Sequence, residues 1–158
     1  MQQYCIYKDN DYYCNMVALT QYFKNSKLNK KKKMKVAYIF KTEMSSTFQL
    51  ATMILPQLEK NIHGVEVIGM FFFDENVHVL RKGNDVGERL NTLAAEKGML
   101  IMACDQCALR RDLAEGTFDS CGTGSVKPKN MIDLGQVGCF PQLYKALGGN
   151  LPDLVITL

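Results

Sequence analysis

From residue 34 onward, short apolar segments rich in β-branched and aromatic residues alternate with segments whose apolar residues recur at helical spacing. The first two strand-like runs are Lys35–Phe40 and Val65–Phe73, and the pattern of strand and helix alternates about five times in all. Successive strands joined by helices favour a parallel sheet with helices packed on both faces. The sequence therefore predicts a three-layer α/β/α fold with a mostly parallel sheet of about five strands.

The segments between the strands carry helix start and stop signals. A helix is expected over residues 48–62, where Pro56 predicts a kink or an early break. Another is expected from its cap Asp85 to Gly98, and a last one from Pro141 to about residue 147. The other expected elements are a turn at 74–76 and a short strand at 77–80, a strand at 99–103, a short helix through 113 to 116, a loop at 117–130, a short strand at 131–134, a turn at 135–138 and a strand at 154–158.

The positive charge of the chain lies entirely in its first segment. Residues 1–33 hold seven lysines and two acids, a charge of +5, whereas residues 34–158 hold twelve Lys and Arg against fourteen Asp and Glu, a charge of −2. A Lys-, Asn- and Tyr-rich segment without a clear period is usually solvated or weakly ordered. We therefore expect residues 1–33 to be a basic, weakly ordered N-terminal extension and residues 34–158 to form one α/β domain. Nucleic acid is not an expected partner.

Composition narrows the class of protein further. A chain of 158 residues with 47% hydrophobic and 22% charged residues has the ordinary proportions of one globular domain. It contains no run of about 18 apolar residues, so no membrane span is expected. Six cysteines are too dilute for a small disulfide scaffold, and Asp9 and Asp11 interrupt the order of a signal peptide. We expect a reduced, cytoplasmic protein with no cofactor and no metal.

In open parallel sheets the functional residues lie in loops beyond the carboxyl ends of the strands. This rule selects residues 42–47, 104–107 and 135–139. The second segment carries the strongest chemical signal, because Cys104 falls where a buried strand ends and a helix begins. Unpaired backbone N–H groups and the positive end of a helix dipole favour the thiolate, which is the nucleophilic form of cysteine.

Charged residues and a second cysteine surround Cys104 in the sequence. Arg110 and Arg111, about two turns further on, are expected to add positive potential, whereas Asp105 opposes it. The spacing of Cys104 and Cys107 permits three chemistries: a disulfide switch, a persulfide carried on one cysteine and resolved by the other, or half of a metal site. A zinc site needs two further ligands, and the remaining cysteines lack the second tight pair of a zinc ribbon. A thioredoxin-type pair is expected early in a domain, whereas this pair follows the third core strand.

The run Leu100–Cys104, three intervening residues and then Ala108–Arg111 resembles the DsrE/DsrF-like sulfur-relay family, and its TusD-like branch especially. The resemblance covers residues 34–158 and rests on the order of several short motifs. It implies a DsrE-like fold with Cys104 as the sulfur-accepting cysteine. It also implies sulfur donor and acceptor proteins as partners and a homo- or hetero-oligomer, a trimer or a hexamer. The other matching segments are the first strand at 34–40, the aromatic strand and turn at 70–77 and the last strand at 152–158.

Two cysteines depart from the pattern of the TusD-like branch. Cys107 stands where that branch often has a small apolar residue, and Cys139 at the start of the last helix is additional. Either is a candidate to attack a persulfide on Cys104 and to release sulfide or pass the sulfur on. His78 is a further candidate, because the corresponding region lies near the site and the subunit contact in the family. Partial exposure of the aromatic strand and turn at 71–77 would support assembly.

The leading hypothesis is a sulfur-relay, sulfurtransferase-like protein that carries persulfide sulfur on Cys104. Cys107 is the candidate resolving thiol, and the supporting candidates are Arg110, Arg111, Cys139 and His78. One alternative is a non-catalytic subunit or interaction module of a sulfur-transfer complex, in which the cysteines are structural. Another is a thiol–disulfide redox protein that uses Cys104 and Cys107 as a dithiol.

Overall fold

The computed structural model describes residues 33–120 and 123–158. The expected N-terminal extension therefore lies, apart from Lys33, outside the described residues. None of the helices within the described ranges is long and apolar enough to cross a membrane. The elements are β1 (Lys35–Phe40), η1 (Ser45–Ile54), α2 (Leu55–Glu59), β2 (Glu66–Phe72), η2 (Asp74–Leu80), α3 (Asp85–Lys97), β3 (Leu100–Cys104), α4 (Asp105–Leu109), β4 (Ala114–Thr117), β5 (Ser125–Pro128), β6 (Gly135–Gly138), α5 (Phe140–Leu147) and β7 (Leu154–Thr157).

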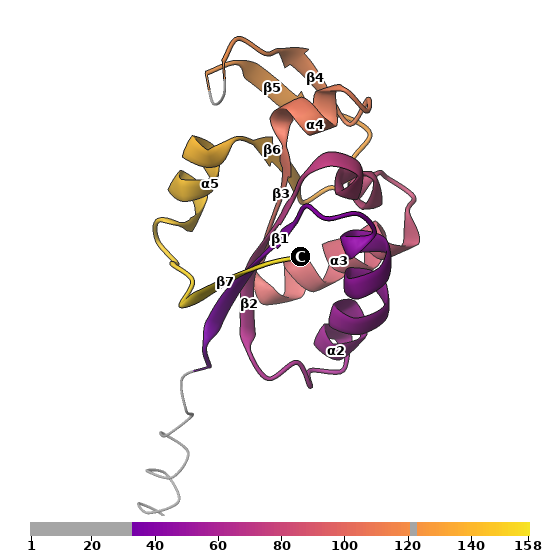
Figure 1. The fold of residues 1–158 in the computed structure, drawn as a ribbon, viewed down its shortest axis with the longest axis vertical. Helices are drawn as coiled ribbons and strands as arrows, with labels where there is room; N and C mark the ends of the chain where they lie inside the picture. The colour runs from indigo at the N-terminus through magenta and orange to yellow at the C-terminus, as the bar shows by residue number, and fades with distance from the viewer. Residues whose placement is uncertain (1–32, 121–122) are drawn as a thin grey trace, which may run out of the picture. The chain divides into compact units, whose positions relative to one another are not determined.

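The core of the described domain is a five-stranded sheet in the order β6-β3-β2-β1-β7, with every neighbouring pair parallel. Helices α2 and α3 lie on one face of this sheet and α5 lies on the other, as Figure 1 shows. The fold predicted from the alternating pattern, a three-layer α/β/α sandwich around about five strands, is therefore confirmed. Parallel strands need such crossovers, which is why each strand is followed by a helical segment or a long connection.

Strand β2 divides its aromatic side chains between the two faces of the sheet. Phe72 stacks on Phe40 with ring centroids 4.9 Å apart, inside the large core beneath α2 and α3. Phe71 points the other way and packs with Met102 and Leu143 in a smaller cluster beneath α5. The expected partial exposure of residues 71–77 is present at Phe73, which is half-buried, and at the two acidic residues after it, whereas Phe71, Phe72 and Val77 are buried within the single chain. The two-residue period of a strand explains the division, because alternate side chains meet different helices.

The first helical segment changes its hydrogen bonding where Pro56 was expected to disturb it. Residues of η1 have the wider π-type spacing, and the ordinary α-helix α2 begins at Leu55. Pro56 lies in the first turn of α2, where a residue without a backbone N–H is tolerated. The predicted break is therefore present as a change of helix type rather than as an end of the helix.

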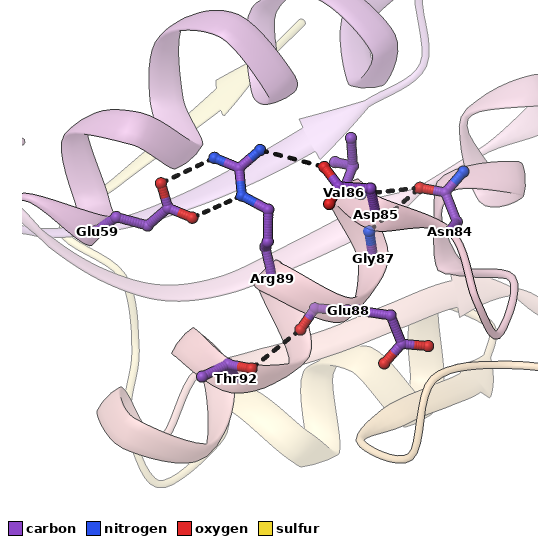
Figure 2. A network of polar contacts seen from close by, with 8 residues as sticks. All are labelled: Glu59, Asn84, Asp85, Val86, Gly87, Glu88, Arg89 and Thr92. Carbon is purple, nitrogen blue, oxygen red and sulfur yellow. Dashed lines mark hydrogen bonds and ion pairs between the residues drawn. The ribbon is translucent and has the colours of Figure 1, made fainter.

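Helix α3 is anchored at its first turn, as Figure 2 shows. The cap is Asn84 rather than the expected Asp85, and the Asn84 side chain accepts hydrogen bonds from the backbone N–H groups of Val86 and Gly87. Arg89, one turn later, donates to both carboxylate oxygens of Glu59 at 2.7 and 2.8 Å. This bidentate contact joins α3 to the end of α2, on the same face of the sheet.

Three short segments differ from the sequence-based expectations. Residues 74–80 form the 3-10 helix η2 instead of a turn and a strand. Helix α4 ends at Leu109, earlier than the expected helix through 113 to 116. The strands β4 and β5 form an antiparallel pair in the region where the end of that helix and a loop at 117–130 were expected. The edge strand β6 occupies residues 135–138, where a turn was expected, while Met131 forms only an isolated bridge with Arg81.

Candidate functional site

A cavity of about 610 Å³ opens where β2, β3 and β6 end. These three strands are neighbours in the sheet, so the segments that follow them meet at one edge. All six site candidates from the sequence line this cavity: Cys104, Cys107, Arg110, Arg111, Cys139 and His78. The residues that complete the lining are Phe73, Asp74, Glu75, Asp105, Gln106 and Phe140.

Cys104 is the last residue of β3 and the cap of α4, so its side chain sits at the strand-to-helix junction. It is a free thiol, partly exposed to the cavity. A hydrogen bond from the Cys107 side chain and the backbone N–H groups of Cys107 and Gln106 lower the pKa of Cys104 to about 7. Burial and the Asp105 carboxylate act in the opposite direction. A large thiolate fraction near neutral pH follows, which makes Cys104 the more nucleophilic of the pair.

Cys107 lies in α4 and is a free, buried thiol whose sulfur faces the start of η2. The backbone N–H of Asp74 donates to Cys107 Sγ at 3.2 Å, and Asp74 Oδ1 lies 3.7 Å from Cys107 Sγ, within reach as a second acceptor for its S–H. The hydrogen bond to Cys104 and burial both raise the pKa of the Cys107 thiol above its ordinary value. The two cysteines therefore share one proton unequally: Cys107 holds it and Cys104 is the thiolate.

Asp105 is a buried carboxylate between the two cysteines in the chain. Its Oδ1 atom accepts a hydrogen bond from the backbone N–H of Gln106 at 2.7 Å and lies 3.9 Å from Cys104 Sγ. The contact with Gln106 satisfies a backbone donor in the first turn of α4. The cost of this arrangement is a negative charge close to the Cys104 sulfur, as the sequence suggested.

The two arginines behave differently from each other. Arg111 pairs with Glu75 and also donates to the backbone carbonyl of Cys107 at 3.2 Å. The Arg111 hydrogen bond holds the pKa of Glu75 below its usual range, and His78 lies 3.1 Å from the other carboxylate oxygen of Glu75. Arg110 is exposed at the cavity, and within the described residues its side chain makes no hydrogen bond or ion pair. Arg110 therefore offers a guanidinium group without an ion-pair partner among the described residues, whereas Arg111 fixes the position of η2 against α4.

Cys139 reaches the cavity from the junction of β6 and α5, next to Phe140. It is disulfide-bonded, which leaves Cys104 and Cys107 as the thiols that the cavity offers. The Phe140 ring packs 5.9 Å from Phe73 and 6.2 Å from Phe71, measured between ring centroids. The lining of the cavity therefore combines the aromatic rings of Phe73 and Phe140 with polar side chains from η2 and α4.

Sequence reasoning missed the contribution of Asp74 and Glu75, which were assigned only to a turn. Both follow β2 directly, so the rule that selects the carboxyl ends of parallel strands could have nominated them. That rule also selected residues 42–47 after β1, and these do not line the cavity. Among the described residues, no group of three or more His, Cys, Asp or Glu side chains is placed to hold a metal ion.

Comparison with known proteins supports the fold. No family model matches the sequence, and no curated protein matches it. Among solved structures, the chain is similar to the YchN protein from E. coli, with a TM-score of 0.51 and 14% sequence identity, over 80% of this chain and 99% of that chain. YchN has a DsrE-like fold, and the α/β fold described here is DsrE-like as well. At this identity the likeness concerns the fold alone, and no sequence match supports the TusD-like branch.

Proposed function

We propose that this protein is a sulfur-relay protein that accepts a sulfane sulfur as a persulfide on Cys104. The observation that carries the proposal is the division of roles between two neighbouring thiols. Cys104 is partly exposed in a cavity and has its pKa lowered to about 7, while buried Cys107 keeps the proton. A DsrE-like fold is consistent with this role, although it does not by itself define the chemistry.

Loading is a thiol exchange on the outer sulfur of a donor persulfide. The Cys104 thiolate attacks that sulfur, a new S–S bond forms to Cys104 Sγ, and the S–S bond of the donor breaks. The donor leaves as a thiolate, and the transferred sulfur keeps its oxidation state, so no external oxidant or reductant is needed. An acceptor thiol then attacks the outer sulfur on Cys104 in the same way, which restores the Cys104 thiolate.

The shape of the cavity supports delivery by another molecule. Its volume of about 610 Å³ has room for a small persulfide or for the tip of a loop on a donor protein. Arg110 offers a charge without a partner among the described residues, which suits an anionic sulfur species. We infer donor and acceptor proteins as partners, and a trimer or hexamer in which exposed apolar residues of the α5 region, Phe140, Tyr144 and Leu151, meet a neighbouring subunit. Light scattering on the full chain at micromolar concentration tests the assembly, and a strict monomer would count against it.

Mass spectrometry after incubation with glutathione persulfide tests the function. We expect a gain of one sulfur atom on the peptide that contains Cys104, lasting in Cys107→Ser and transient in the wild type, and no gain there in Cys104→Ser. The serine hydroxyl is not a nucleophile at this pH, so the loss in Cys104→Ser should be complete. Equal loading of Cys107→Ser and Cys104→Ser would refute the proposal.

Two other results separate the alternatives. If the wild type forms a disulfide between Cys104 and Cys107 while Cys107→Ser gains no sulfur on Cys104, the protein acts as a dithiol redox protein. If neither a persulfide nor a disulfide forms, the cysteines are structural and the protein is an interaction module. Cys107→Ser is the matched control, because it removes the second thiol and retains a hydrogen-bond donor beside Cys104.

A further inference from the structure

Asp74 contacts the sulfur of Cys107 with two different groups. Its backbone N–H lies 3.2 Å from Cys107 Sγ, and its carboxylate Oδ1 lies 3.7 Å from the same atom. One group stabilises a negative sulfur, and the other accepts its proton. No other described side chain outside the cysteine pair makes a hydrogen bond to Cys107 Sγ.

The backbone at Asp74 takes an unusual conformation that produces both contacts. Asp74 has φ of 48°, in the left-handed region, at the point where β2 ends and η2 begins. Asp and Asn tolerate this region better than other residues with a side chain, but it still costs free energy. Such a conformation is retained where the surrounding structure requires it, and it is concentrated at functional sites.

We infer that Asp74 is the base that takes the proton from Cys107 when Cys107 resolves a persulfide on Cys104. The inference rests on the proposed function for its sulfur substrate. In the resting pair, Cys107 donates its hydrogen bond to the Cys104 thiolate. Once Cys104 carries a second sulfur, it is no longer a thiolate, and the Cys107 S–H turns to Asp74 Oδ1. A rotation of one hydrogen changes the acceptor without moving a heavy atom.

The step balances without any further reagent. The proton of Cys107 passes to the Asp74 carboxylate, and the Cys107 thiolate attacks Cys104 Sγ. A Cys104–Cys107 disulfide forms, the bond from Cys104 to the outer sulfur breaks, and that sulfur leaves as hydrosulfide, which takes up the proton from Asp74. The two cysteines are oxidised to a disulfide while the sulfane sulfur is reduced to sulfide. An external dithiol then reduces the disulfide and is itself oxidised.

Other charged groups lie around this pair and define its electrostatic setting. Arg111 binds the carbonyl of Cys107, and its charge also acts on Cys107 and Asp74. Asp105, Glu75, His78 and Arg110 line the same cavity. None of them makes a hydrogen bond to Cys107 Sγ, so among these groups only Asp74 is in position to accept its proton directly.

The attack of Cys107 on a disulfide at Cys104 can be followed on the full chain with dithiobis(nitrobenzoate), an aromatic disulfide that releases coloured thionitrobenzoate. The Cys104 thiolate releases one equivalent as it forms a mixed disulfide, and Cys107 then displaces a second. The phase that disappears in Cys107→Ser is the resolution step, whatever other cysteines react. This assay needs no persulfide, so it tests Asp74 separately from the sulfur-relay function.

Asp74→Asn is the informative variant, because Asn has the same shape and tolerates the same left-handed backbone. We expect its first phase to match the wild type and its resolution phase to slow by about tenfold or more. The rate of that phase should also become steeply dependent on pH, since Cys107 must then lose its proton to solvent. A residue that only shapes the backbone would leave the pH dependence unchanged.

Asp112→Asn is the matched control. Asp112 is an exposed aspartate with φ of 54° that pairs with Lys129 and does not line the cavity. Its resolution rate and pH profile should equal those of the wild type. An Asp74→Asn protein with wild-type rate and pH profile would overturn the inference, and so would equal slowing in Asp112→Asn. If both phases behave as expected but glutathione persulfide never loads Cys104, the proposed function fails while the role of Asp74 stands.

Discussion

Two strands of the same sheet, β1 and β3, end in loops of opposite character. After β1, the side chains of Ser45 and Ser46 are fully buried, and Asn76 fills the space between them and Thr42. After β3, Cys104 and its neighbours line an open cavity of about 610 Å³. Both loops follow parallel strands at the same edge of the sheet, so position at the carboxyl end nominates them equally.

The difference lies in where the polar groups of each loop find partners. Asn76 accepts hydrogen bonds from the Ser45 hydroxyl at 3.0 Å and the Ser46 N–H at 2.9 Å, and it donates to the Thr42 carbonyl at 3.1 Å. The buried polar groups of that loop are satisfied internally, and its exposed residues do not line the cavity. At β3, the thiolate of Cys104 is held by donors on one side and faces the cavity on the other. The β3 loop is the stronger candidate for a functional loop because its reactive groups are accessible from the cavity.

The largest expected effect is a difference in alkylation rate when a thiol is placed in the loop after β1. In Ser45→Cys, we expect alkylation by iodoacetamide at residue 45 to be on the order of 100-fold slower than at Cys104, because reaction requires local opening. Peptide mapping of alkylated protein distinguishes the two sites, and Ser45→Ala controls for loss of the hydroxyl. Comparable rates at the two positions would show that the β1 loop is not closed in solution.

Removing the side chain that closes the β1 loop should destabilise the whole domain. We expect Asn76→Ala to lower the free energy of unfolding by about 2–3 kcal/mol, since it leaves buried donors and an acceptor without partners. The corresponding fall in Tm is roughly 5–15 °C. Asn91→Ala is the control, because Asn91 makes a single exposed contact with the backbone of Leu134. A similar Tm for both variants would contradict the structural role of Asn76.

The loop after β3 should differ from the loop after β1 in how the alkylation rate of its cysteine depends on pH. Only the thiolate alkylates, so the rate at Cys104 should rise with pH and level off above its pKa of about 7. Cys107→Ala removes the strongest hydrogen-bond donor and should move the midpoint upward, towards the ordinary cysteine value of about 8.5. Cys107→Ser keeps a donor and should keep the low midpoint. An unchanged midpoint in Cys107→Ala would mean that the backbone N–H groups alone lower the pKa.

Long elements of this fold could be predicted from the sequence because their signals are local. Strand β2 is a continuous apolar run and helix α3 has a helical period, and Gly98 ends α3 as expected. Strand β6 was missed because it begins and ends with glycine, which usually indicates a turn. Gly138 is needed there for close packing, since a Cβ would lie 2.9 Å from the Cβ of Gln142. Segment 77–80 alternates apolar and polar residues only briefly, and burial of Val77 and Leu80 fits the three-residue period of η2 instead.

The candidate site also has a part that could be predicted from the sequence and a part that could not. Cys104 could be predicted because a strand, a helix start and a second cysteine all fall within a few residues of one another. Asp74 could have been nominated by its position after β2, but its contacts with Cys107 could not, since they depend on how close η2 lies to α4. Arg111 was expected to act on Cys104, but it pairs with Glu75 across that same gap. Contacts between segments that are distant in sequence are the part that local patterns do not contain.

The smallest effect is expected from removing residues 1–33, because both loops and the periodic pattern lie in the remainder of the chain. β1 starts at Lys35, and every described contact of the β1 and β3 loops is made by residues after 33. We therefore expect the shortened chain to keep its Tm within a few degrees and to preserve the slow and fast alkylation of the two loops. A drop of more than about 10 °C, beyond the shift that 1 kcal/mol produces, would mean that the first segment packs as part of the domain.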